Sequence, residues 1–455
     1  MEIKGKKISI IGAVRSGIGA AKLIQKLGGF PFVSDSGSES KLKESIKKLK
    51  ELKIDFEIGN HSEKVFDCDL MIISPGVPYE ADVLLKTRKK KIQTVSEIEL
   101  AALFCKGNII AITGTNGKTT TTSLCTHVLN NCGLKTYEAG NIGTAFSEIA
   151  LDVKENEFVS LEVSSFQLDL IDKFKPKVAV ILNITPDHLN RYQNKFENYI
   201  NSKLRIFKNQ DQNDFLILNY DDTTLNDSVK NSNDKKTVSK RKDFYFSLSN
   251  DQPNGCSVKN GKVIFKKDGK KLFECSVSDI NLKGEHNIAN AMAVITIAKL
   301  FNADNKKIIE ALSSFKGVEH RLELVRVIGG VKFINDSKAT NVDSVWYALR
   351  SFDEPIFLIL GGQDKGNDYN KIKDLVKNKV VKIYAIGSSA DKVFNFFHSF
   401  VKVEIKQSLE EVIHAANNEA RQNEVVLLSP ACASFDMFDN YEHRGKVFKE
   451  AVNGL

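Results

Sequence analysis

The chain has 455 residues, which corresponds to about three domains of ordinary size rather than one continuous core. Hydrophobic residues make up 42% of it and charged residues 27%, a globular composition that excludes a collagen-like fibre, a disordered tail protein and a small disulfide-bonded scaffold. The net charge of +8 arises from 65 basic and 57 acidic residues, and the lysine-rich stretch 41–53 is interleaved with glutamates, as is typical of a solvated helix face rather than a nucleic-acid patch.

Apolar runs in the sequence are all shorter than the roughly 18 to 20 residues that a membrane helix needs. The seven cysteines show no Cys-x-x-Cys pairing, which disfavours structural zinc and suits reduced thiols. We therefore expect a cytoplasmic protein that binds neither nucleic acid nor a membrane. A monomer is the expected oligomeric state, although no sequence pattern determines it.

The first block alternates short apolar strands with amphipathic helices, which is typical of a parallel α/β layer. Strands are predicted at residues 7–11, 32–34 and 70–73. The turn from Gly12 to Gly19 is similar to a dinucleotide fingerprint, although Val14 replaces its middle glycine. Asp35 ends the second strand, where a carboxylate can bind a ribose or a base. A simple packing turn explains this segment equally well.

The second block opens with the strongest local pattern in the chain. An apolar strand at 108–112 leads into Thr113-Gly-Thr-Asn-Gly-Lys-Thr-Thr120 and then into a helix. Glycines let backbone amides surround phosphate oxygens, Lys118 can reach the β and γ phosphates, and Thr119 can place a hydroxyl on Mg²⁺. Ile112 occupies the outer glycine position of the longer form of this motif. ATP is the predicted ligand.

Further polar residues in this block follow apolar strands. Glu162 and His188 both lie at strand carboxyl ends, where open α/β sheets bind ligands. A carboxylate there can hold Mg²⁺, whereas a histidine considered alone is more often a hydrogen-bonded structural residue. Lys203, in the helical stretch 198–207, is by pattern alone a surface lysine.

The remaining pattern completes an α/β chain with three domains. Strands are predicted at 158–163, 178–184 and 215–219, a β-rich excursion at 221–280, a helix at 286–301, and further strands at 331–334, 356–360, 382–386 and 425–428. The predicted fold is a Rossmann-like N-terminal domain, a central P-loop ATPase-type domain with a mainly parallel sheet, and a Rossmann-like C-terminal domain. The predicted boundaries are 1–96, 97–301 and 302–455.

A series of polar motifs runs from the phosphate loop to the C-terminal region. They occupy residues 113–120, 161–168, 185–191, 202–205, 284–291, 319–321, 335–341, 361–366 and 429–436. In this order the motifs resemble those of the Mur ligases of peptidoglycan synthesis, and the resemblance covers essentially the whole chain. It implies an ATP-dependent ligase that joins D-glutamate to UDP-N-acetylmuramoyl-L-alanine through an acyl phosphate, releasing ADP and phosphate.

The resemblance also implies roles for individual residues. The implied ATP-binding residues are Gly114, Thr115, Asn116, Gly117, Lys118, Thr119, Thr120, Asn290, Arg321 and Asp336. Those implied for the UDP substrate are Arg15, Ser16, Asp35, Ser36 and Asn141, with Gly37 standing where the family often has an arginine. Those implied for D-glutamate are Thr340, Lys365, Ser434 and Tyr441.

Two Mg²⁺ ions are implied as well. Their implied ligands are Thr119, Glu162, His188 and Lys203, and the last of these is carbamylated in the family. Carbamylation ends the side chain in a carboxylate, which can coordinate a cation where an ammonium cannot. Lys118, His188 and Lys203 are the implied catalytic residues, with His188 or a metal-held water as the base.

Other functions remain open on the sequence alone. A ligase of the same group could add a different amino acid, and a phosphate loop also serves ATPases, kinases and non-catalytic nucleotide-binding modules. The last three would leave the strand-end loops at 361–366 and 429–436 without an evident purpose.

Overall fold

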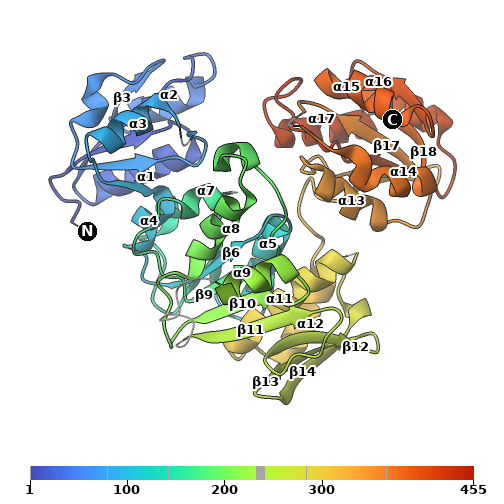
Figure 1. Cartoon of the computed structure of the whole chain (residues 1–455), viewed down its shortest axis with the longest axis horizontal. Coiled ribbons are helices and arrows are strands. Elements are labelled where there is room, and N and C mark those ends of the chain that lie inside the picture. Colours follow the sequence, from blue (N-terminus) through green and yellow to red (C-terminus); the bar gives the residue numbers. More distant parts are fainter. Residues whose placement is uncertain (1, 79, 142, 232–240, 283, 365) are drawn as a thin grey trace. The chain divides into compact units, whose positions relative to one another are not determined.

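The computed structural model describes residues 2–78, 80–141, 143–231, 241–282, 284–364 and 366–455. Within these ranges the strands form three sheets, each with parallel strands at its centre (Figure 1). The predicted α/β fold class with three domains is confirmed. None of the helices in the described ranges has the length and hydrophobicity required to span a bilayer. All seven cysteines are free thiols, as expected.

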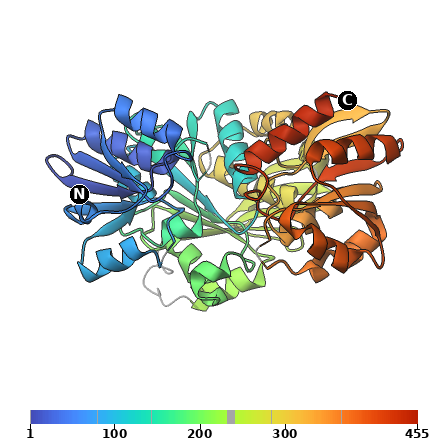
Figure 2. The same ribbon diagram turned by 90° about the horizontal axis from the view of Figure 1, so that it is seen from above.

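The N-terminal sheet is parallel throughout and has the strand order β3-β2-β1-β4-β5. Its strands are β1 (Lys7–Ile11), β2 (Phe30–Asp35), β3 (Asp55–Ile58), β4 (Leu70–Ile73) and β5 (Thr94–Ser96). Helices α1 (Arg15–Lys26), α2 (Lys43–Glu51) and α3 (Asp82–Lys89) lie on both sides of it (Figure 2), and α4 (Glu97–Ala102) follows. The central strands β1 and β4 are apolar and buried because both faces of the sheet are covered.

The central sheet has the order β14-β13-β12-β11-β10-β9-β6-β8-β7. Its strands are β6 (Asn108–Thr113), β7 (Thr136–Gly140), β8 (Phe158–Glu162), β9 (Val178–Ile181), β10 (Phe215–Asn219), β11 (Lys242–Ser247), β12 (Gly255–Lys259), β13 (Lys262–Lys267) and β14 (Lys270–Ser276). Only β12, β13 and β14 pair antiparallel, which confirms the β-rich excursion. The first strand of the block, β6, lies between β8 and β9.

Helices and short 3₁₀ turns connect the central strands. They are α5 (Lys118–Asn131), α6 (Phe146–Ile149), α7 (Ser165–Leu168), η2 (Leu189–Tyr192), α8 (Phe196–Leu204), η3 (Arg205–Phe207), α9 (Thr223–Asn231), η4 (Val277–Asp279), α11 (Glu285–Leu300) and α12 (Asn305–Ser314).

The C-terminal sheet has the order β15-β16-β20-β17-β18-β19, with only β15 antiparallel to its neighbour. Its elements are β15 (Glu323–Ile328), β16 (Val331–Asn335), α13 (Val342–Arg350), β17 (Ile356–Gly361), α14 (Lys373–Lys379), β18 (Val380–Ile386), α15 (Ala390–Phe397), β19 (Lys402–Ile405), α16 (Leu409–Glu419), β20 (Val425–Leu428) and α17 (Tyr441–Asn453). Helices α13 to α15 share one apolar cluster with the sheet and α16 and α17 another, so both faces are covered.

By internal contacts the chain divides into two compact units. One contains Met1–Asn281 and Ala289–Phe315, and the other contains Leu282–Ile288 and Lys316–Leu455. The division into segments 1–96, 97–301 and 302–455 stays a prediction.

Candidate active site

Four neighbouring strands of the central sheet end at the same edge. Asn141 follows β7, Glu162 ends β8, the phosphate loop 113–120 follows β6, and the segment 183–188 follows β9. The strand order therefore brings together groups that lie far apart in the sequence. Such an edge, beside the point where the strand order reverses, is where open α/β sheets bind ligands.

The phosphate loop has the backbone that its glycines predict. Gly117 has a φ of 84° at the start of α5, and a Cβ there would lie 2.7 Å from the Oδ1 atom of Asn290. The ammonium group of Lys118 donates to the carbonyl oxygens of Gly114 and Thr115, at 2.9 and 2.7 Å. The loop therefore holds a positive charge beside the N-terminus of a helix, which is an arrangement suited to phosphate.

Lys203 is buried against this loop rather than exposed, so the pattern-based interpretation as a surface lysine is wrong. Its side chain is 1% exposed, and its Nζ donates to the carbonyl oxygen of Gly114 at 2.8 Å and lies 4.7 Å from the ring centre of Tyr199. Burial, followed by the nearby charge of Lys118, lowers the pKa of Lys203 well below its ordinary value of 10.5. A neutral amine is the nucleophilic form of lysine, and it is the form that reacts with CO₂.

Glu162 is also buried, at 2% exposure. Its Oε1 atom accepts a hydrogen bond from the Nδ2 atom of Asn141 at 3.2 Å. Its Oε2 atom is buried without a hydrogen-bond partner in the part of the chain that the structure describes. A buried carboxylate oxygen is costly unless it is paired, and a hard cation such as Mg²⁺ is a suitable partner. The residues present therefore fit a magnesium site.

His188 lies at the same sheet edge but is exposed. Its backbone adopts the left-handed conformation with a φ of 52°, just before η2. The imidazole packs edge-on against the ring of Phe166 at 5.0 Å, and its Nε2 atom lies 3.7 Å from a carboxylate oxygen of Asp187. Because the imidazole is exposed, a substrate or a cation can reach it.

In the N-terminal sheet, Asp35 connects the first glycine turn to the turn after β2. Its two carboxylate oxygens accept hydrogen bonds from the backbone N–H groups of Ala13 and Gly37, both at 2.7 Å. Arg15, at the start of α1, and Ser36 are exposed beside this pair of turns, and Ser16 is half-buried. The predicted residues for the UDP substrate in this sheet thus gather at the carboxyl ends of β1 and β2.

In the C-terminal sheet, Asp336 is buried directly after β16. It accepts hydrogen bonds from the hydroxyl of Ser429 at 2.8 Å and the backbone N–H of Leu322 at 3.3 Å, and the guanidinium of Arg321 lies 3.8 Å away. Burial raises the pKa of this carboxyl to about 6, although Arg321 opposes the shift.

The residues expected to bind D-glutamate also lie at the carboxyl edge of the C-terminal sheet. Thr340 is half-buried in the segment between β16 and α13, and Ser434 is buried in the loop after β20. Tyr441 begins α17, and its hydroxyl accepts a hydrogen bond from the Nζ atom of Lys338 at 3.2 Å. Lys365 lies outside the described residues.

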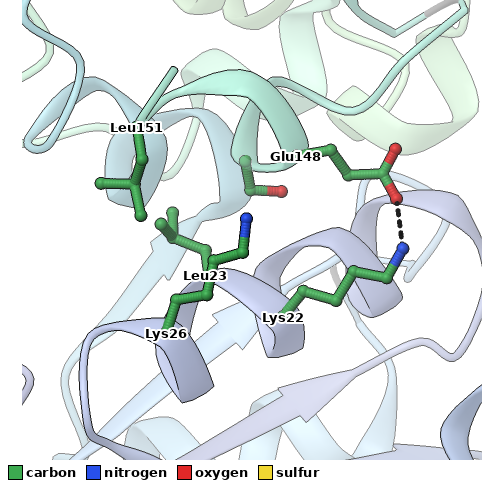
Figure 3. Close-up of a pocket in the computed structure, with 6 residues that line it drawn as sticks. Lys22, Leu23, Lys26, Glu148 and Leu151 are labelled. Carbon is green, nitrogen blue, oxygen red and sulfur yellow. Dashed lines mark hydrogen bonds and ion pairs between the residues drawn. The ribbon is translucent and has the colours of Figure 1, made fainter. Parts of the chain in front are cut away.

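A separate pocket of about 230 Å³ lies between α1 and α6 (Figure 3). It is lined by Lys22, Leu23, Lys26, Ser147, Glu148 and Leu151. Lys22 and Glu148 form an ion pair across it at 3.2 Å. None of these lining residues belongs to the predicted site.

Two residues near the phosphate loop were not predicted from the sequence. Tyr199 contacts the hydroxyl of Thr115 at 3.1 Å and lies under Lys203, and its spacing of four residues from Lys203 on one helix was the available signal. Asn183 contacts the backbone of Asn116, and its place at a strand end was the only signal for it.

Comparison with known proteins gives consistent matches along the chain. Residues 7–83 match the MurD N-terminal domain, residues 112–298 the Mur ligase middle domain, and residues 320–432 the Mur ligase, glutamate ligase domain. The chain is 44% identical to a UDP-N-acetylmuramoylalanine–D-glutamate ligase of Chloroherpeton thalassium, over 100% of this chain and 99% of that protein.

Solved structures share the fold. UDP-N-acetylmuramate-alanine ligase from Thermotoga maritima has a TM-score of 0.65 at 20% identity, with 99% of each chain covered. MurF ligase from the same organism, in complex with ADP, has a TM-score of 0.59 at 16% identity, with 93% of this chain and 95% of that chain covered. With three matching domains and a close relative along its full length, the chain belongs to the Mur ligase family and, within it, to the UDP-N-acetylmuramoylalanine–D-glutamate ligases.

Proposed function

We propose that this protein joins D-glutamate to UDP-N-acetylmuramoyl-L-alanine with ATP, in the synthesis of peptidoglycan precursors. The observation that carries the proposal is the 44% identity to a ligase of that name over the full chain. The buried lysine and carboxylate beside the phosphate loop supply the chemistry that such a reaction needs.

The reaction requires activation of a carboxylate. An amine does not displace an oxygen from a carboxylate at neutral pH, because the leaving group is poor and the negative charge deactivates the carbonyl carbon. In the proposed sequence a carboxylate oxygen of the acceptor attacks the γ phosphorus, and the bond from that phosphorus to the β–γ bridging oxygen breaks, which releases ADP. The D-glutamate amine then attacks the acyl carbon of the acyl phosphate, loses a proton, and expels phosphate.

Two anions must meet in the first step, so positive charge is the main requirement on the protein. Lys118 provides a fixed ammonium at the phosphate loop, and the helix N-terminus of α5 adds to its potential. Mg²⁺, when bound, neutralises phosphate charge, and Thr119, Glu162 and His188 are the residues proposed to hold it. In the second step the proposed acceptor of the amine proton is either a water held at the metal site or the exposed imidazole of His188 when it does not hold the cation.

Lys203 is proposed to be carbamylated. Burial and the charge of Lys118 lower its pKa and so favour the uncharged amine, which can add to CO₂ to form a carbamate with release of one proton. The product is an anion, which would complete the ligand set with Glu162. The neighbouring charge of Lys118 favours that anion, whereas it disfavours an ammonium at the same place.

The segments 1–96, 97–301 and 302–455 are proposed to bind the UDP substrate, ATP and D-glutamate in that order. Asp35 is the proposed partner of the uracil or ribose end, together with Arg15, Ser16 and Ser36. Asn141 is proposed to contact the muramoyl end, since it lies beside Glu162. In the third segment Thr340, Lys365, Ser434 and Tyr441 are the proposed contacts of D-glutamate. The proposed contacts of ATP outside the phosphate loop are Asn290 in the second segment and Arg321 and Asp336 in the third.

The amino-acid specificity can be tested in parallel reactions. The protein is incubated with UDP-N-acetylmuramoyl-L-alanine, ATP and Mg²⁺, and with D-glutamate, L-glutamate, L-alanine or diaminopimelate, and the product masses are measured. We expect a gain of one glutamyl residue with D-glutamate and no gain with the other three. A product with another amino acid but not with D-glutamate would contradict the proposed specificity.

A further inference from the structure

The side-chain amide of Asn183, which follows the neighbouring strand, forms two hydrogen bonds with the phosphate loop. Asn183 follows β9, and its Oδ1 atom accepts a hydrogen bond from the backbone N–H of Asn116 at 2.8 Å. Its Nδ2 atom donates to the backbone carbonyl of the same Asn116 at 3.1 Å. One amide therefore satisfies both backbone groups of a loop residue, as a neighbouring strand would.

Backbone and hydroxyl contacts extend this connection on both sides. The N–H of Thr115 donates to the carbonyl of Asn183 at 3.0 Å. The hydroxyl of Thr115 accepts from the N–H of Thr185 and donates to its carbonyl, each at 3.0 Å. The phosphate loop and the segment after β9 are thus joined over successive residues, although 67 positions separate Asn116 from Asn183.

This network holds the shape of the loop through hydrogen bonds within the protein. The backbone N–H groups of Thr115 and Asn116 are bonded to Asn183 and so are directed toward β9. The N–H groups at the start of α5 are then presented to the phosphates. Asn183 and His188 lie on the same segment after β9. The hydrogen bonds that fix Asn183 therefore also help to fix the position of His188. Because these hydrogen bonds contribute to ordering the loop, ATP binding has less ordering free energy to supply.

We propose that Asn183 is a positioning residue, which holds the phosphate loop in its ATP-binding shape and keeps the His188 segment in register with it. The inference rests on the proposed function, because it takes ATP as the ligand of the loop. Asparagine suits this role because one side chain supplies both a donor and an acceptor. Aspartate has the same shape but would turn an oxygen toward the carbonyl of Asn116 and add a negative charge beside the phosphates.

The test compares Asn183→Ala and Asn183→Asp with a matched control at the neighbouring strand. Asn219, at the end of β10, also donates its amide to a backbone carbonyl, that of Leu182 at 3.1 Å, and accepts from the N–H of Asp221 at 3.0 Å. Asn219→Ala therefore removes a similar pair of hydrogen bonds without removing a contact to the phosphate loop.

Two quantities are measured on each full-length variant. They are the KM values for ATP and D-glutamate in the ligation reaction, and the rise in melting temperature caused by ADP. We expect Asn183→Ala to raise the KM for ATP roughly 10- to 100-fold, as for other groups that orient a binding site. Asn183→Asp should raise it further. The KM for D-glutamate should stay unchanged in both, and Asn219→Ala should keep the wild-type KM for ATP.

Equal KM values for ATP in Asn183→Ala and Asn219→Ala would overturn the inference, as would an equal rise for ATP and D-glutamate. If Asn183→Ala does not fold, the isosteric Asn183→Asp decides by the same two readouts. A wild-type protein that shows no ligation would refute the proposed function. The ADP-induced shift would then still decide the role of Asn183, since it does not require catalysis.

Discussion

Lys203 differs clearly between what its sequence pattern predicts and what the folded chain shows. The neighbouring residues in the sequence do not predict that it is buried. In the structure its Nζ atom contacts the carbonyl oxygen of Gly114 and the ring of Tyr199. Burial at this place lowers its pKa, and a buried amine with a low pKa is reactive. The sequence predicted its function only through the resemblance to a family.

The substitution Lys203→Arg tests whether a carbamate is needed. Arginine has a long basic side chain similar to lysine but does not form the carbamate, so we expect kcat for ligation to fall about 100-fold or more. The matched control is Lys208→Arg, because Lys208 is an exposed lysine just after η3 and should tolerate the change. Equal Mg²⁺-dependent rates in Lys203→Arg and the wild type would remove Lys203 from the site.

Asp336 should make stability depend on pH. Burial raises its pKa from 3.8 to about 6, so the folded chain binds this proton more tightly than the unfolded chain does. Its contribution to the free energy of unfolding is fully present below pH 3.8 and is lost as pH rises to about 6. At 1.36 kcal/mol for each pKa unit, the loss is roughly 3 kcal/mol at most.

The substitution Asp336→Asn removes that charge and keeps an oxygen for the Ser429 hydroxyl. We expect the variant to lose the decline in stability between pH 4 and 6, while ADP binds more weakly. Thermal unfolding at a series of pH values measures this, with Asp353→Asn as a control at an exposed position. If Asp336→Asn and the wild type show the same dependence of melting temperature on pH, this carboxyl is not the cause of that dependence.

Among the secondary-structure elements, the buried strands were predictable and the edge strands were not. Strands β1, β4, β10 and β20 have the predicted bounds, because strands covered on both faces form continuous apolar runs. The strands missed individually outside the β-rich excursion are β3, β5, β7, β15 and β19, and each of them is an edge strand of its sheet. Edge strands are partly solvated, so their apolar pattern is weak.

In the candidate site too, local pattern predicted some features and missed others. Strand-end positions of Glu162 and His188 followed from local pattern. The contact of Glu162 with Asn141 depends on β8 pairing with β7, and that of Asn183 with Asn116 depends on β6 pairing with β9. Local pattern does not determine that strand order. Burial of Lys203 likewise depends on where α8 packs. Pattern therefore predicts which strand ends carry chemistry, while topology decides which of them meet.

The turn into α5 provides a test at the level of one element. Gly117→Ala places a left-handed alanine at the start of the helix with its Cβ 2.7 Å from the Asn290 amide. Gly133, just after the same helix, has a similar φ of 82° but open space around it. Both substitutions should cost about 1 kcal/mol or somewhat more of stability through backbone strain.

Only Gly117→Ala should also lose nucleotide binding, because it alone moves the phosphate loop. The rise in melting temperature on adding ADP measures this, and we expect it to vanish in Gly117→Ala and to persist in Gly133→Ala. Retention of the full ADP shift in Gly117→Ala would show that the loop tolerates displacement or does not bind the nucleotide.

Across the whole molecule, three sheets repeat one principle. Each has its apolar strands at the centre and, at the carboxyl ends, polar residues that are predicted to bind ligands, as for Asp35, Glu162 and Asp336. Composition and periodicity predicted this architecture, since both depend on short-range pattern and on chain length. The identity of the substrates did not follow from composition or periodicity, and the full-length match to D-glutamate ligases is the support for them.

The most direct test of an ATP-driven ligation is whether ADP formation depends on UDP-N-acetylmuramoyl-L-alanine, the substrate to which the amino acid is joined. ADP and the glutamyl product are quantified together in reactions with D-glutamate, ATP and Mg²⁺, with and without UDP-N-acetylmuramoyl-L-alanine. We expect one ADP for each glutamyl product when the acceptor is present and almost no ADP when it is omitted. ADP formation at the same rate without the acceptor would contradict the central claim and identify the protein as an ATPase.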